Sequence, residues 1–168
     1  MNKVILVTGA AKRIGKQIAK EFFAIDFNII VHFNSSSEDA ISLCDELNAI
    51  RPNSAISIQA NLDHMNDVKN LASQAMSAFG RIDGLINNAS TFYPTPMGEF
   101  SEKDWDALMG SNLKAPLFLV QELHEELKRQ SGFVIKNRFS GGCPEMFVRE
   151  FGHIPDRFRP QIYNYDAG

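Results

Sequence analysis

Three residues near the amino terminus, Thr8, Gly9 and Gly15, have types and a spacing that could bind phosphate. Gly9 permits a tight turn and a close approach of the backbone to a ligand. Gly15 opens a predicted helix, whose unpaired N–H groups and positive dipole end attract an anion. A dinucleotide pyrophosphate fits such a loop. The alternative is a strand, a turn and a helix that bind no ligand.

The segments around this loop must position it. Residues 4–7 are apolar without polar alternation, which is typical of a parallel strand buried on both faces. Residues 16–24 predict a helix with an apolar stripe, and residues 28–33 predict a second buried strand. The alternation of strands and helices continues to residue 130 and predicts an α/β fold with a doubly wound parallel sheet. Its strands are expected near residues 3–8, 28–33, 55–59 and 82–88.

Polar side chains without negative charge follow the second strand. In dinucleotide-binding folds an Asp or Glu at this place binds the ribose hydroxyl of NAD. Here hydroxyl, amide and imidazole groups can donate to a 2′-phosphate, and two basic residues of the glycine loop add positive charge. The residues are His32, Asn34, Ser35 and Ser36, with Lys12 and Arg13 from the loop. This pattern favours NADPH over NADH, although Ser35 and Glu38 could instead form a helix capping box.

Length and composition restrict the class of protein. The 168 residues, 44% of them hydrophobic, are enough for one globular domain with a core. The net charge of −3 gives no basic surface, so a small-molecule substrate is favoured over nucleic acid or an anionic membrane. No apolar run reaches about 18 residues, and Met1 leads directly into the first strand, so we expect a cytoplasmic chain. Cys44 and Cys143 have no metal-ligand spacing and predict no metal site.

Two motifs resemble those of the short-chain dehydrogenase/reductase family. The loop from Thr8 to Gly15 matches the family's T-G-x-x-x-G-x-G, with Arg13 in place of the second glycine, and this variant is similar to the pteridine reductases. Residues 87–90 read Asn-Asn-Ala-Ser, where the family has N-N-A-G or N-N-A-S beside the cofactor. Both motifs follow strands, at the edge where doubly wound sheets bind ligands. The resemblance covers residues 1–132 and implies a Rossmann-type fold, incomplete at the carboxyl terminus.

The resemblance also implies site residues and a reaction, namely hydride transfer from NADPH to a pterin or folate-like ring. Phe92 would stack on that ring, while Arg13 and Ser90 contact its polar edge. Asn112 would support a proton-relay water by distorting its helix, and Pro116 within the helical pattern agrees with a distortion. The expected cofactor-binding residues are Thr8, Gly9, Lys12, Arg13, Ile14, Gly15, His32, Asn34, Ser35, Ser36, Asn61, Leu62, Asn88, Ala89 and Ser90. The alternatives are a ketoreductase acting on a carbonyl or acyl substrate and a catalytically inactive nucleotide-binding remnant.

Agreement with the family ends near Gly132. Residues 133–135 begin like a strand, but Lys136 and Arg138 put charge where a central strand should be buried. The family's catalytic Tyr-x-x-x-Lys is not found, because Tyr163 is followed four positions later by Ala167. We therefore expect a dinucleotide-binding domain over residues 1–132 and a divergent tail over residues 133–168. A truncated or frameshifted reading frame would explain this tail, and so would a diverged paralogue. The fifth strand should then leave an unpaired apolar edge, and the homo-oligomer typical of the family is in doubt.

Overall fold

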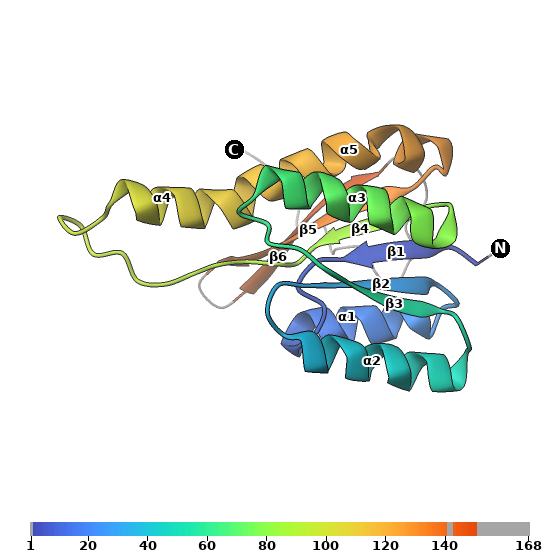
Figure 1. Ribbon diagram of the computed structural model, residues 1–168. Helices are drawn as coiled ribbons and strands as arrows, with labels where there is room; N and C mark the ends of the chain where they lie inside the picture. The colour runs from blue at the N-terminus through green and yellow to red at the C-terminus, as the bar shows by residue number, and fades with distance from the viewer. Residues whose placement is uncertain (1, 141–142, 151–168) are drawn as a thin grey trace, which may run out of the picture.

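A six-stranded sheet forms the centre of the computed structural model, with the strand order β3-β2-β1-β4-β5-β6 (Figure 1). The structure describes residues 2–140 and 143–150, and side chains through residue 137. The strands are β1 (Val4–Val7), β2 (Asn28–Phe33), β3 (Ala55–Gln59), β4 (Gly84–Asn87), β5 (Phe133–Ser140) and β6 (Cys143–Glu150). The helices are α1 (Arg13–Phe23), α2 (Ser37–Ile50), α3 (Met65–Phe79), α4 (Glu102–Met109) and α5 (Ala115–Arg129), with a π-helical turn at Gly110–Lys114.

The strands β1 to β5 are parallel, which confirms the predicted α/β class and doubly wound sheet. From β1 the chain moves outward to β2 and β3 and then returns to β4 on the other side of β1. This reversal places the carboxyl ends of β1 and β4 side by side with a crevice between their loops. The glycine loop follows β1 and the Asn-Asn-Ala-Ser motif follows β4, so both reach the same edge of the sheet.

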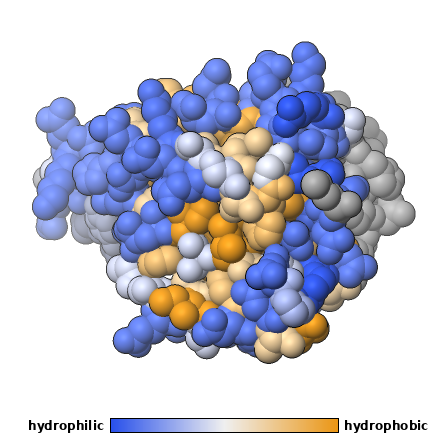
Figure 2. All heavy atoms as spheres, turned by 45° about the vertical axis from the view of Figure 1, so that its right-hand side comes forward, coloured by the Kyte–Doolittle hydropathy of each residue, from blue (hydrophilic) through white to orange (hydrophobic). Residues whose placement is uncertain are grey.

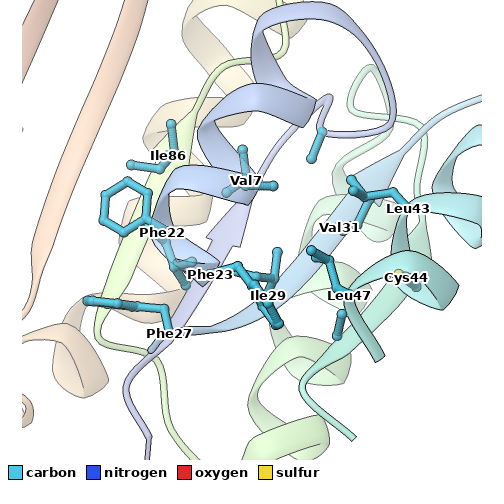
Figure 3. Packing of buried hydrophobic residues seen from close by; sticks show 14 of the residues in the cluster. Val7, Phe22, Phe23, Phe27, Ile29, Val31, Leu43, Cys44, Leu47 and Ile86 are labelled. Atoms are coloured by element: carbon cyan, nitrogen blue, oxygen red, sulfur yellow. The ribbon is translucent and has the colours of Figure 1, made fainter. Parts of the chain in front are cut away.

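Helices cover both faces of the sheet, as Figure 1 shows, and this explains why β1 is apolar throughout. Ile5 and Val7 pack on one face in a cluster with residues of α1 and α2. Val4 and Leu6 pack on the other face with residues of α3 and α5. Figure 3 shows part of the first cluster, where the rings of Phe22 and Phe27 lie 5.2 Å apart, edge to face. The buried sheet gives the site a rigid base.

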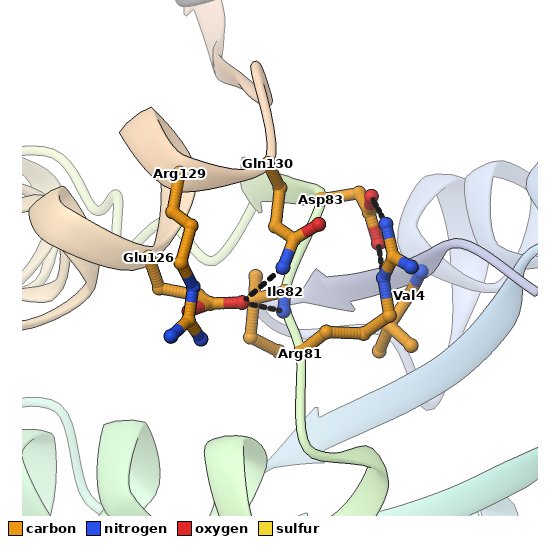
Figure 4. Close-up of polar contacts among 7 residues, drawn as sticks. All are labelled: Val4, Arg81, Ile82, Asp83, Glu126, Arg129 and Gln130. Carbon is orange, nitrogen blue, oxygen red and sulfur yellow. Dashed lines mark hydrogen bonds and ion pairs between the residues drawn. The ribbon is translucent and has the colours of Figure 1, made fainter. Parts of the chain in front are cut away.

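Two buried carboxylates fix the amino end of β4 (Figure 4). Asp83 accepts hydrogen bonds from the Val4 N–H at 2.8 Å and from Arg81 Nε at 2.8 Å. Glu126 accepts hydrogen bonds from Gln130 Nε2 at 2.9 Å and from the Ile82 N–H at 3.4 Å. These contacts hold β4 in register against β1 and α5, so the motif at the other end of β4 is held as well.

The fifth strand departs from the sequence expectation. Despite its charge, Lys136 lies within β5, where its side chain is half-buried and desolvation lowers its pKa. Asn137 is buried and donates to Asn88 Oδ1 at 3.1 Å. The expected unpaired edge was wrong, because β6 pairs antiparallel with β5 along its length. Tyr163 and Ala167 lie outside the described residues.

The surface seen in Figure 2 is mostly hydrophilic, with a hydrophobic area near its centre. The composition agrees, since 17 basic and 20 acidic residues are spread over the chain. Within the described ranges, no helix combines the length and the apolar character that a membrane span requires.

Candidate functional site

A pocket of about 420 Å³ opens at the carboxyl ends of β1, β2 and β4. Twelve of the fifteen expected cofactor residues line it: Gly9, Lys12, Arg13, Ile14, Gly15, His32, Asn34, Asn61, Leu62, Asn88, Ala89 and Ser90. Thr8 is buried beneath it, and Ser35, Ser36, Phe92 and Asn112 are outside the lining. Thus the two motifs and the end of β2 meet in one place. Of the expected substrate and catalytic residues, Arg13 and Ser90 line the pocket, whereas Phe92 and Asn112 do not.

The two motifs interlock through their side chains. Thr8 Oγ1 accepts hydrogen bonds from the backbone N–H groups of Asn88 and Ala89, each at 3.0 Å. In return, Asn88 Nδ2 donates to the carbonyls of Thr8 at 2.9 Å and Gly9 at 3.2 Å. A Cβ on Gly15 would come within 2.2 Å of the Gly9 carbonyl oxygen and 2.6 Å of Asn88 Nδ2. Glycine at position 15 therefore lets α1 approach both loops.

The amino terminus of α1 forms one wall of the pocket. The helix begins at Arg13, three residues before the predicted start, and Lys12 precedes it without a side-chain cap. Uncapped first-turn N–H groups and the helix dipole suit an anion. Arg13 has a left-handed φ of 51°, which explains why glycine is usual at this place in the family motif. Arg13 has this strained backbone conformation, and it adds a guanidinium group to the pocket lining.

His32 supports the glycine loop from the end of β2. Its Nδ1 accepts the Gly9 N–H at 3.1 Å, and its Nε2 lies 3.1 Å from the Ala60 carbonyl. A carbonyl can only accept, so Nε2 carries the hydrogen and the ring is neutral. Burial lowers the pKa of His32 to about 4, in agreement with a neutral ring. The expectation that this imidazole donates to a phosphate is therefore corrected, because both ring nitrogens already bind the backbone.

The start of α2 lies next to Lys12, which lines the pocket. Ser36 is its N-cap residue but makes no side-chain capping bond, so the capping box expected as the alternative at Ser35 and Glu38 is not formed. The first turn carries Glu38 and Asp39, and Asp39 Oδ2 lies 2.9 Å from Lys12 Nζ. A second helix terminus without a side-chain cap thus lies near the first, and an ion pair connects the two.

The sequence did not identify three of the lining residues: Asp63, Thr91 and Ser111. Asp63 directly follows the expected Asn61 and Leu62, and its N–H donates to Asn61 Oδ1 at 3.1 Å. Ser111 lies in the π-helical turn, which no helical period predicts. The only sequence signal for these three residues is their position. Asp63 follows Leu62, Thr91 follows Ser90, and Ser111 precedes Asn112, where the sequence predicts a helix distortion.

Asn112 lies in the π-helical turn, so the helix is distorted where the sequence suggested. Its Oδ1 accepts the Thr91 N–H at 3.1 Å, and its Nδ2 donates to the Thr91 carbonyl at 2.7 Å. Asn112 therefore holds the loop that carries Phe92. Phe92 itself is 89% exposed, so its contact with a substrate stays a prediction.

Comparison with known proteins identifies the family. The family model described as short chain dehydrogenase matches residues 3–141. The chain belongs to this family. It is 37% identical to pteridine reductase 1 of Leishmania tarentolae, over 70% of this chain and 52% of that protein. It is 32% identical to a 3-oxoacyl-acyl-carrier-protein reductase of Staphylococcus epidermidis, over 80% of this chain and 55% of that protein.

A hydroxynaphthalene reductase-like protein of Metarhizium guizhouense is also 32% identical, over 79% of this chain and 49% of that protein. The chain therefore spans about half the length of the curated relatives it matches. Members of this short-chain dehydrogenase family are oxidoreductases that use a nicotinamide cofactor, and the pocket described above has the helix termini and the close backbone approach that a pyrophosphate needs.

Proposed function

We propose that the chain binds NADPH in this pocket and that residues 1–132, extended by β5, form the dinucleotide-binding unit of a reductase. The interlocked loops of Thr8 and Asn88 are the observation that carries the proposal. They hold the uncapped start of α1 and the backbone of Gly9 around an open pocket. This arrangement suits an anionic ligand better than a turn with a purely structural role.

The preference for NADPH follows from charge. The end of β2 carries His32 and Asn34 at the pocket, with no carboxylate to accept from a ribose hydroxyl. Lys12 and Arg13 supply positive charge at the same wall, which favours a 2′-phosphate dianion. When bound, the nicotinamide would supply the hydride, and this chain's residues bind and orient it.

The proposed substrate is a flat pterin or folate-like ring. Support comes from the likeness to a pteridine reductase and from Phe92, an exposed ring two residues after the pocket residue Ser90. An aromatic ring that stacks on a heterocycle contributes about 0.5–1.5 kcal/mol beyond the buried area. The second candidate, a ketoreductase for acyl substrates, is supported by the likeness to 3-oxoacyl reductases.

Calorimetric titration of the purified chain with NADPH and NADH tests the cofactor, and tighter binding of NADPH is expected. Arg13→Gly should weaken NADPH more than NADH, since it removes a charge at the pocket while relieving a strained φ. Equal affinities, or an unchanged preference in Arg13→Gly, would contradict the phosphate assignment.

Titration with a dihydropterin in the presence of NADPH tests the substrate. Phe92→Ala should weaken pterin binding about tenfold, as expected for the loss of a stacked ring, and leave NADPH affinity unchanged. Met97→Ala, an exposed apolar residue in the same loop, is the matched control. If Phe92→Ala and Met97→Ala bind pterin equally well, the acyl ketoreductase becomes the better proposal.

A further inference from the structure

An ion pair connects a residue of the pocket lining with the start of a neighbouring helix. Lys12 lines the pocket immediately before α1, and Asp39 lies in the first turn of α2. The distance from Lys12 Nζ to Asp39 Oδ2 is 2.9 Å. The lysine that the proposed function assigns to the 2′-phosphate is therefore already bound to a carboxylate of this chain.

The pair is weak enough to exchange. The side chains of Lys12 and Asp39 are 55% and 44% exposed, so water and salt screen their attraction. A phosphate dianion carries more charge than a carboxylate and is a stronger acceptor for an ammonium group. Lys12 can thus leave Asp39 and bind a phosphate. Breaking the ion pair costs free energy, and this cost makes the binding of the phosphate weaker.

The same carboxylate also opposes a phosphate directly. The start of α2 has no side-chain cap, and an anion placed there would meet the positive end of the helix dipole. Asp39 occupies this first turn with a negative charge, as does Glu38. The two acids differ in one respect: within the described residues only Asp39 has an ion pair with a lysine of the pocket.

We propose that Asp39 sets the cofactor preference of this pocket by holding Lys12 in an ion pair, which weakens the binding of NADPH and leaves NADH unaffected. NADH has no 2′-phosphate, so it neither needs Lys12 nor is repelled by Asp39 at this place. The inference rests on the proposed function, since it assumes a dinucleotide in the pocket. It predicts that the natural chain prefers NADPH less strongly than its basic residues alone suggest.

Titration with NADPH and NADH at low and high salt tests this. The four variants of the full chain are Asp39→Asn, Glu38→Gln, Lys12→Met and the double variant Lys12→Met with Asp39→Asn. Asp39→Asn should bind NADPH about threefold to tenfold more tightly, with NADH affinity unchanged and a smaller effect at high salt. Glu38→Gln removes an equal charge from the same turn and should change NADPH affinity less than twofold. In a Lys12→Met background, Asp39→Asn should have no more effect than Glu38→Gln.

Three results would overturn the inference while NADPH binding itself persists. They are an equal shift for NADPH and NADH in Asp39→Asn, an equal shift in Glu38→Gln, and a full effect of Asp39→Asn without Lys12. Failure of the natural chain to bind either dinucleotide is distinguishable from these, because it removes the proposed function and this inference together. Urea unfolding of each variant verifies that affinity is compared between folded proteins.

Discussion

At the scale of single residues, the pocket depends on groups that hold backbone rather than ligand. His32 is 2% exposed, and both of its ring nitrogens bind main-chain groups of neighbouring loops. The sequence showed correctly that a polar residue, His32, lies near the end of β2, and the structure places it at the pocket. It could not show which way the ring turns, because that depends on Gly9 and Ala60, which lie in the loops after β1 and β3.

Acid should destabilise the protein through His32. Burial lowers its pKa from 6.5 to about 4, so the unfolded chain binds more protons at this residue between these pH values. The contribution of His32 to the free energy of unfolding is therefore present above pH 6.5 and decreases by about 3 kcal/mol as pH falls to 4.

Urea unfolding between pH 7 and pH 4 measures this effect. His32→Asn, whose amide oxygen can still accept the Gly9 N–H and does not titrate, should lack this part of the pH dependence. His64→Asn at an exposed position should keep it. An identical pH dependence in His32→Asn and the natural protein would show that the ring is not held neutral.

Gly15→Ala tests the close approach of α1. The new Cβ would overlap the Gly9 carbonyl and Asn88 Nδ2, so α1 has to shift, and we expect a loss of about 1–3 kcal/mol in unfolding free energy together with weaker NADPH binding. Gly80→Ala is the control, since Gly80 has a φ of 70° but no atom within 4 Å of the added Cβ. It should lower stability by about 1 kcal/mol and leave binding unchanged. Normal NADPH affinity in Gly15→Ala would contradict the pocket assignment.

At the scale of elements, apolar runs predicted the strands well. The ranges 28–33 and 55–59 match β2 and β3 to the residue. β2 is buried along nearly all of its length and has a clear apolar pattern, whereas the edge strand β3 alternates between apolar and polar residues and follows a turn at residues 51–53. The start of α1 was placed too late, since the left-handed backbone of Arg13 has no signature in its side chain. Lys136 argues against a buried strand at residues 133–140, but it pairs with Asn87 at the end of β4, where its half-buried side chain tolerates a charge that a fully buried position would not.

The loop at Thr91 and Phe92 should depend on Asn112, which lies in the π-helical turn. Asn112→Asp keeps an acceptor for the Thr91 N–H but replaces the donor to the Thr91 carbonyl with a second oxygen. Two acceptors then face each other, and we expect a loss of about 1–3 kcal/mol in unfolding free energy and faster amide hydrogen exchange at Thr91 and Phe92. Gln121→Glu makes the same amide-to-carboxylate change on the exposed side of α5 and should alter neither measurement. Unchanged exchange in Asn112→Asp would show that other contacts hold this loop.

At the scale of the whole molecule, the sheet edge proposed to bind the dinucleotide has no tyrosine positioned as a proton donor within the described part of the chain. Tyr93 is the single tyrosine among the described residues, and its hydroxyl donates to Asp104 Oδ1 at 3.0 Å. Desolvation and the contact with Asp104 raise its pKa, which makes it a poorer acid. The sequence likewise lacks the family's Tyr-x-x-x-Lys.

The chain should therefore bind NADPH but oxidise it slowly. Proximity of hydride and substrate remains, whereas a positioned general acid typically contributes 10²–10⁴-fold, so we expect a kcat roughly 10²–10⁴-fold below that of a pteridine reductase assayed with the same dihydropterin. Tyr93→Phe should leave the residual rate unchanged, because the hydroxyl it removes is bound to Asp104. Two results would contradict this prediction: a rate equal to that of the reference enzyme, and a rate that is lost in Tyr163→Phe. Either would show that residues outside the described part supply the acid. The described pocket would then bind the cofactor, and another segment would complete the reaction.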